Sequence, residues 1–81
     1  MYNILDIVVL DDKKEYVVAS KAQVAGETFY LLAEVNNYKN VKYYQEVDNG
    51  TSLAQVRDKK ILSDLAIVLY ENSKKFYEEI D

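Results

Sequence analysis

The chain has no cysteine, no histidine and no proline, and only two glycines in 81 residues. Without cysteine it can form neither a disulfide nor a thiolate metal site. Without histidine it lacks the usual general base near neutral pH and the commonest metal ligand. Two glycines are too few for a glycine-rich phosphate-binding loop. Only carboxylate or lysine chemistry stays open to an enzyme, so we expect no catalytic residues, no cofactor and no metal.

The charge pattern also limits the partners that the chain can bind. The net charge is −4, and the lysine pairs each lie beside acidic residues instead of forming a basic stripe. We therefore expect no direct binding to nucleic acid. The longest apolar runs, Ile7–Leu10 and Leu65–Tyr70, are far shorter than the ~20 residues that span a membrane. The N-terminus lacks the pattern of a signal peptide, which predicts a cytoplasmic protein without membrane contact.

The first two thirds of the chain alternate apolar and polar residues over short stretches, which predicts β-strands. The expected strands are Ile4–Leu10, Glu15–Val24, Thr28–Val35, Val41–Val47 and Ser52–Val56. The first is apolar on both faces except at Asp6, a pattern typical of a central or doubly covered strand. A loop is expected over residues 36–40, where three asparagines tolerate left-handed turns. Asn49-Gly50 predicts a two-residue hairpin turn.

The last third has helical spacing. Asp58 is a suitable N-cap for a helix over Lys59–Glu79. One stripe of that helix is apolar apart from Ser73, and its members are Leu62, Leu65, Ala66, Leu69, Phe76 and Ile80. The fold class predicted for the single domain, residues 1–81, is α+β, an antiparallel meander of about five strands with one C-terminal helix packed on one face. The helix is expected on the sheet face that carries Phe29, Leu31, Ala33 and Val35.

Three stretches resemble a bacterial family of small acidic proteins, the YrzB-like proteins of a domain of unknown function. Residues Asp11–Val18 combine an acidic turn with a Glu-Tyr-Val strand. Residues Gly26–Leu32 pass from a glycine turn into an aromatic and aliphatic strand, and the third stretch is the closing helix from Asp58. The resemblance implies the same α+β fold and a bacterial cytoplasmic location, and it carries no activity or site residues.

Eight tyrosines in 81 residues are the most distinctive positive feature. Sheet propensity accounts for tyrosines in strands, but tyrosine is also enriched at protein interfaces. Since a single helix covers one side of the sheet, we expect an exposed apolar face behind it. Its protein-binding residues would be Tyr30, Leu32 and Tyr44, with Val17 adjacent. Such a face would cover a few hundred Å² and would be buried by a protein partner or by self-association.

These features favour a non-enzymatic protein-binding module from a bacterium or a phage, with a homodimer as an open possibility. The alternative is a phage or mobile-element inhibitor that blocks a nucleic-acid-binding enzyme by acidic mimicry of DNA. The two hypotheses differ in their dependence on salt. A charge mimic should release its target steeply as the salt concentration rises, whereas binding through a tyrosine face should barely respond.

Overall fold

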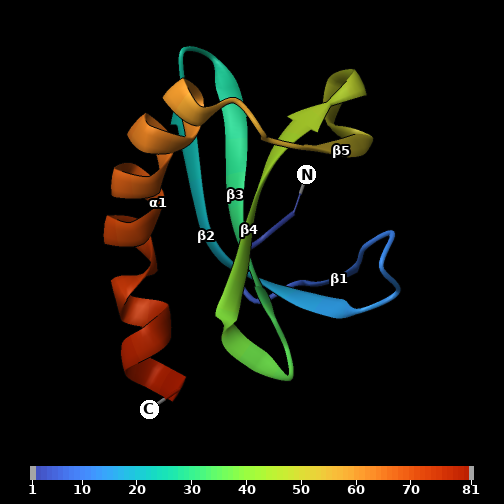
Figure 1. Ribbon diagram of the computed structural model, residues 1–81, viewed down its shortest axis with the longest axis vertical. Helices are drawn as coiled ribbons and strands as arrows, with labels where there is room; N and C mark the ends of the chain where they lie inside the picture. Colours follow the sequence, from blue (N-terminus) through green and yellow to red (C-terminus); the bar gives the residue numbers. More distant parts are fainter. Residues whose placement is uncertain (1, 81) are drawn as a thin grey trace.

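The computed structural model describes residues 2–80, with side chains placed as far as Glu78, and contains five antiparallel strands followed by one helix (Figure 1). The strands are β1 (Ile7–Val9), β2 (Glu15–Val24), β3 (Glu27–Glu34), β4 (Asn37–Val47) and β5 (Ser52–Gln55), and the helix is α1 (Lys59–Ile80). Strands that follow one another in the chain are neighbours in the sheet. The predicted α+β meander with a C-terminal helix is confirmed.

The helix packs on the sheet face that was expected. It begins where Asp58 Oδ1 accepts a hydrogen bond from the Lys60 backbone N–H over 2.9 Å, as its N-cap role requires. Its buried stripe meets apolar side chains of β2 and β3 in one cluster, which contains Val17, Ala19, Ala22, Phe29, Leu31, Ala33, Leu65, Leu69 and Phe76. Ser73 is also buried, and the side chain of Ile80 lies outside the described part. No helix within residues 2–80 is long and apolar enough to cross a membrane.

The strand predicted over Ile4–Leu10 differs most from the structure. Only Ile7–Val9 form a strand, and β1 lies at the edge of the sheet, so the expectation of a central strand is wrong. The preceding residues turn instead, because the Asn3 backbone N–H donates to Asp6 Oδ2 over 2.8 Å and the Asp6 N–H donates to the Asn3 carbonyl over 3.0 Å. Leu5 has a φ of 78°, which interrupts the extended backbone.

Two connections also differ from their predictions. The chain turns at residues 35–36, and β4 already begins at Asn37, so the loop expected over residues 36–40 is wrong. Glu34 pairs with Asn37 while Ala33 pairs with Val41, so residues 38–40 bulge from the β3–β4 register. After β4, a short turn, η1 (Asp48–Gly50), in which all three residues have positive φ, precedes Thr51. The connection is therefore longer than the two-residue hairpin expected at Asn49-Gly50, although both residues have the positive φ that such turns use.

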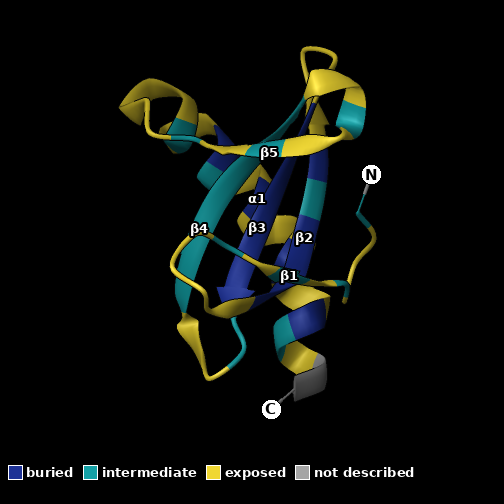
Figure 2. Cartoon of the chain, turned by 90° about the vertical axis from the view of Figure 1, so that its right-hand side faces the viewer, coloured by how far each residue is buried: buried dark blue, intermediate teal, exposed yellow. Residues whose placement is uncertain are grey.

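The sheet is strongly curled. A register shift between Val18 and Ser20 marks a β-bulge in β2, and bulges bend a strand and increase its twist. Figure 2 shows the result: β2 and β3 are buried in the centre, α1 lies behind them, and β1 and β5 cross in front. Both faces of the central strands are therefore covered by the chain itself.

Candidate functional site

The residues predicted to form an exposed binding face lie inside the protein. Tyr30 and Leu32 are 0% exposed, and Tyr44 is half-buried. Tyr30 and Leu32 form a second buried apolar cluster with Tyr16 and Val18 on the sheet face opposite α1. The partly buried residues that cover it are Tyr2, Val8, Leu10, Tyr44 and Leu53. The expectation of an open face is therefore wrong, because the curled sheet brings β1, β5 and the N-terminal segment across it.

Tyr30 holds the N-terminal segment in place over this face. Its hydroxyl donates a hydrogen bond to Glu46 Oε2 over 2.6 Å and accepts one from the Tyr2 backbone N–H over 3.1 Å. The Tyr2 and Tyr30 rings meet edge to face, with centroids 5.8 Å apart. Val17, which was expected beside this face, lies on the helix side instead, since it pairs with Ala33.

The buried hydroxyl of Tyr30 should make the protein sensitive to alkaline pH. Burial, and next the hydrogen bond to the Glu46 carboxylate, raises the Tyr30 pKa from its ordinary value of 10.0 to about 12. A folded-state pKa above the unfolded value adds stability below the unfolded pKa, and this stability is lost as the pH rises. We expect the urea midpoint, followed by circular dichroism, to fall between pH 10 and pH 12.

Two tyrosine-to-phenylalanine variants test whether the Tyr30 hydroxyl causes the fall of the urea midpoint. Tyr30→Phe should start less stable at pH 8 by about 1–2 kcal/mol, because it loses the hydroxyl's hydrogen bonds, and should then lose less stability between pH 10 and pH 12. Tyr70→Phe, which changes an exposed tyrosine, should retain the pH dependence of the wild type. Equal pH dependence in all three proteins would show that the Tyr30 hydroxyl is not responsible.

A smaller polar network closes the far end of the second cluster. Asp12 Oδ2 accepts hydrogen bonds from the Tyr16 hydroxyl over 2.7 Å and from Lys42 Nζ over 3.2 Å. The Tyr16 hydroxyl first, and then the Lys14 backbone N–H, lower the pKa of Asp12 to about 2. A carboxylate that is so firmly ionised is a poor proton acceptor at neutral pH. Among the side chains that the structure describes, residues 2–78, no three acidic groups are placed so that they could hold a metal ion.

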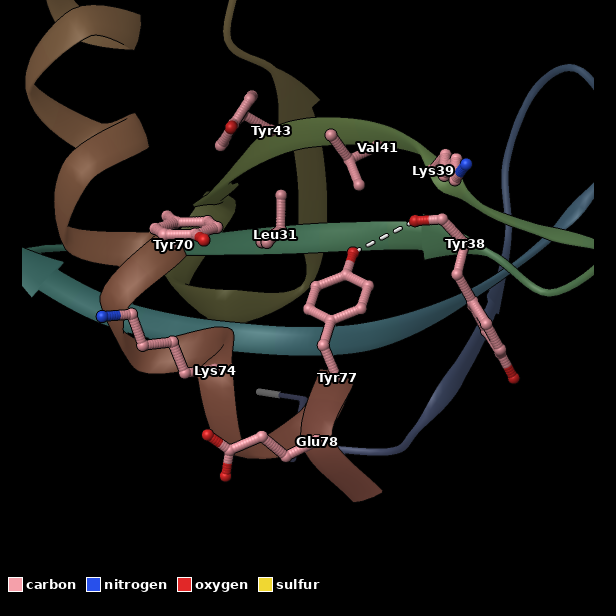
Figure 3. Close-up of a pocket in the computed structure, with 9 residues that line it drawn as sticks. All are labelled: Leu31, Tyr38, Lys39, Val41, Tyr43, Tyr70, Lys74, Tyr77 and Glu78. Atoms are coloured by element: carbon pink, nitrogen blue, oxygen red, sulfur yellow. Dashed lines mark hydrogen bonds between the residues drawn. The ribbon is translucent and has the colours of Figure 1, made fainter. Parts of the chain in front are cut away.

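A groove of about 730 Å³ lies between α1 and β4 (Figure 3). We call it the tyrosine groove, because four of its lining residues are tyrosines: Tyr38 and Tyr43 from β4, and Tyr70 and Tyr77 from α1. Leu31 and Val41 also line it. Half of the tyrosines of the chain therefore gather at one surface, on the helix side of the sheet.

The position of the helix explains why the groove exists. α1 packs mainly on β2 and less on β3, so it leaves the same face of β4 uncovered. Val41 and Tyr43 are on that face, since they pack against the helix-side cluster. Tyr70 and Tyr77 are seven residues apart, which is two helical turns, so both lie on the flank of α1 that faces β4. Because the helix lies to one side of the sheet, α1 forms one wall of the groove and β4 forms the other.

Contacts at the C-terminal end of α1 hold two rings of the groove in place, those of Tyr38 and Tyr77. The Tyr77 hydroxyl donates a hydrogen bond to the Tyr38 carbonyl over 3.1 Å, drawn as a dashed line in Figure 3. The Phe76 ring meets Tyr38 and Tyr77 edge to face, at centroid distances of 5.7 and 5.1 Å. Burial, and next the electrostatic effect of Tyr43, raises the pKa of Tyr77. The Tyr77 hydroxyl, neutral at physiological pH like that of any tyrosine, therefore remains a donor further into the alkaline range.

The rim of the groove carries charged side chains, namely Lys39, Lys74 and Glu78. Lys74 Nζ lies 3.1 Å from Glu71 Oε2 and 5.9 Å from the centre of the Tyr70 ring. The Tyr70 ring itself is 60% exposed. A second hollow continues from Tyr43 and Tyr70 towards Ile67, whose side chain is 69% exposed. The groove thus joins exposed aromatic and aliphatic surface to a rim with two cations and one anion.

Sequence reasoning missed these four tyrosines as a group. The seven-residue spacing of Tyr70 and Tyr77 on one helix flank was a usable signal, as was the alternation that places Val41 and Tyr43 on one strand face. The sequence carried no signal for the lateral placement of α1 over β2 and β3, and this placement brings the two pairs together.

Comparison with protein-family models, with curated proteins and with solved structures returned no match. The resemblance to the YrzB-like family therefore stays a prediction. Any function proposed for this chain depends on its own geometry.

Proposed function

We propose that this protein is a non-enzymatic protein-binding module and that the tyrosine groove is its contact surface. The observation that carries the proposal is the convergence of Tyr38, Tyr43, Tyr70 and Tyr77 on one groove. Tyrosine supplies a large apolar ring and a polar hydroxyl with few rotatable bonds, and it is enriched in the residues that dominate binding energy.

The fixed rings support this function. Tyr77 is hydrogen-bonded to the β4 backbone and packed on Phe76, which also contacts Tyr38. Side chains that are already ordered lose less conformational entropy when a partner binds. Tyr70, the most exposed of the four, is then the ring that gains most from being covered, so we expect it to contribute most to affinity.

The size of the groove indicates what kind of partner surface fits it. Its volume of about 730 Å³ lies within the ~300–1,000 Å³ of typical small-ligand pockets. It is too small for a folded domain and suits a short segment of a partner protein. We therefore propose that the partner inserts an extended segment between α1 and β4.

Selection from a displayed library of random peptides tests the proposal. The tightest selected peptide is then titrated against the wild type, Tyr70→Ala and Val9→Ala. Tyr70→Ala should weaken binding by about 10-fold or more, the loss seen for central interface aromatics. Val9 is an equally exposed residue (63%) on β1, an edge strand that β2 and β3 separate from β4, so Val9→Ala should bind like the wild type.

Two results would contradict the proposal. One is that no peptide can be selected, and the other is a selected peptide whose affinity is unchanged by Tyr70→Ala. The salt dependence adds a separate measurement on the same peptide. Affinity through the groove should change little with ionic strength, whereas a steep loss with salt would favour the acidic-mimicry alternative.

A further inference from the structure

We infer that the segment bound by the tyrosine groove is proline-rich, in the left-handed polyproline II conformation, with a carboxylate beside it. This inference rests on the proposed function and adds the chemistry of the partner. It follows from the hydrogen-bond donors of the groove, the spacing of its rings, the irregular backbone of β4 and the charge of the rim.

The polar groups of the groove include several donors, beside two acceptors, the Glu78 carboxylate and the Tyr77 hydroxyl oxygen. Lysine ammonium groups donate only, and tyrosine hydroxyls can donate; the groove holds Lys39, Lys74 and the hydroxyls of Tyr43 and Tyr70. The Tyr38 carbonyl already accepts the Tyr77 hydroxyl. A ligand that offers acceptors can therefore pair with these donors. A proline-rich segment does so, because each residue has a carbonyl and proline has no backbone N–H.

The spacing of the rings suits the polyproline II repeat. Tyr70 and Tyr77 are separated by seven residues, or about 10 Å along the helix at 1.5 Å per residue. The polyproline II helix has three residues per turn and a rise of 3.1 Å, so equivalent side chains recur about every 9 Å. Two prolines one turn apart can therefore contact Tyr70 and Tyr77, and aromatic-lined grooves are known to bind this rigid, low-entropy conformation.

The backbone of β4 argues against the other extended conformation, a β-strand added to the sheet. Strand addition needs a regular row of unpaired backbone groups. Residues 38–40 of β4 bulge out of register with β3, and bulges terminate or distort pairing. The Tyr38 carbonyl is also occupied by the Tyr77 hydroxyl. β4 is also an inner strand that pairs with β3 and with β5, so the side chains of the groove are better placed than the β4 backbone to hold a partner.

The rim supplies the preference for a carboxylate. The protein as a whole has a net charge of −4, but the groove is lined by two lysines and one glutamate. Lys74 already pairs with Glu71, whereas Lys39 lies at the other wall, on β4. A glutamate or aspartate next to the proline stretch would lie near Lys39 in this arrangement.

Nuclear magnetic resonance titration of the ¹⁵N-labelled protein tests the inference with three synthetic peptides. The probe is an octaproline that ends in two glutamates; the controls are a glycine-serine peptide with the same ending and a threonine-valine repeat that favours β-strands. The octaproline should shift the amides of Tyr43, Tyr70 and Tyr77 in a saturable manner. Its affinity should fall by about 10-fold or more in Tyr70→Ala and stay unchanged in Val9→Ala.

Each other result overturns the inference in a recognisable way. Saturable groove shifts with the threonine-valine repeat and not with octaproline would assign strand addition instead. Equal shifts with octaproline and the glycine-serine peptide would show that proline is not recognised. If the library peptides depend on Tyr70 but contain no proline, this inference fails while the proposed function stands. If they do not depend on Tyr70, the proposed function itself fails.

Discussion

Replacing Tyr30 with alanine is expected to lower the free energy of unfolding by about 3–5 kcal/mol, the range for large-to-small changes at buried aromatic residues. The Tyr30 side chain is fully buried in the second cluster, and its removal leaves a cavity beneath Tyr2. It also removes the hydroxyl that links the Tyr2 backbone to Glu46. Since a chain of this length has a total stability of about 4–12 kcal/mol, much of the population should unfold at 37 °C.

Urea unfolding followed by circular dichroism measures this loss, with Tyr70→Ala as the matched control. Both variants delete a tyrosine ring, but Tyr70 is 60% exposed, so its removal should change stability by about 0.5 kcal/mol or less. Equal midpoints for the two variants would mean that the N-terminal segment does not cover Tyr30 in solution. Tyr30→Ala is therefore unsuitable for a binding test, because the variant would lose binding by unfolding and not by losing a contact with the partner.

Leu69→Ala is expected to destabilise the protein by about 2–5 kcal/mol. Leu69 is fully buried in the helix-side cluster, near the middle of α1. Most of the stability of an amphipathic helix in a protein comes from the packing of its apolar face, so α1 depends on the sheet. The loss of one central leucine contact should therefore reduce helical content together with tertiary structure.

Ile67→Ala is the matched control for this change. It removes an aliphatic side chain of similar size two residues away, from a position that is 69% exposed. The urea midpoint should stay within about 0.5 kcal/mol of the wild type. If Ile67→Ala proved as destabilising as Leu69→Ala, the face of α1 that docks on the sheet would have to be different.

Local signals were sufficient for most of the secondary structure. β2 has the bounds Glu15–Val24 that the alternation predicted, and α1 begins at Lys59 because Asp58 caps it. The helix-side core was also predictable. In both elements, the period of the apolar residues determines which face is buried, and that period can be read within a short window.

The covering of the second face depends on contacts that are distant in sequence. The hydrogen bond of Tyr2 to Tyr30 joins residues 28 positions apart, and the bulge at Ala19 that curls the sheet leaves no local signature in the sequence. A flat sheet with one helix would have exposed Tyr30, whereas the curled sheet buries it. The candidate site was predicted in the wrong place for this reason. The sequence shows how many tyrosines the chain has, but contacts between distant residues decide which of them are exposed.

The Phe76 side chain belongs to the hydrophobic core and also supports two rings of the tyrosine groove. A ligand that packs against Tyr38 and Tyr77 therefore also affects the packing of Phe76, which anchors the C-terminal half of α1 in the core. Ligand binding in the groove and thermal stability should therefore be linked. The melting temperature should rise as the ligand concentration exceeds the dissociation constant. Fraying of the last helical turns would remove Tyr77 from one wall of the groove, so ligand binding and the folding of this end of α1 should stabilise each other.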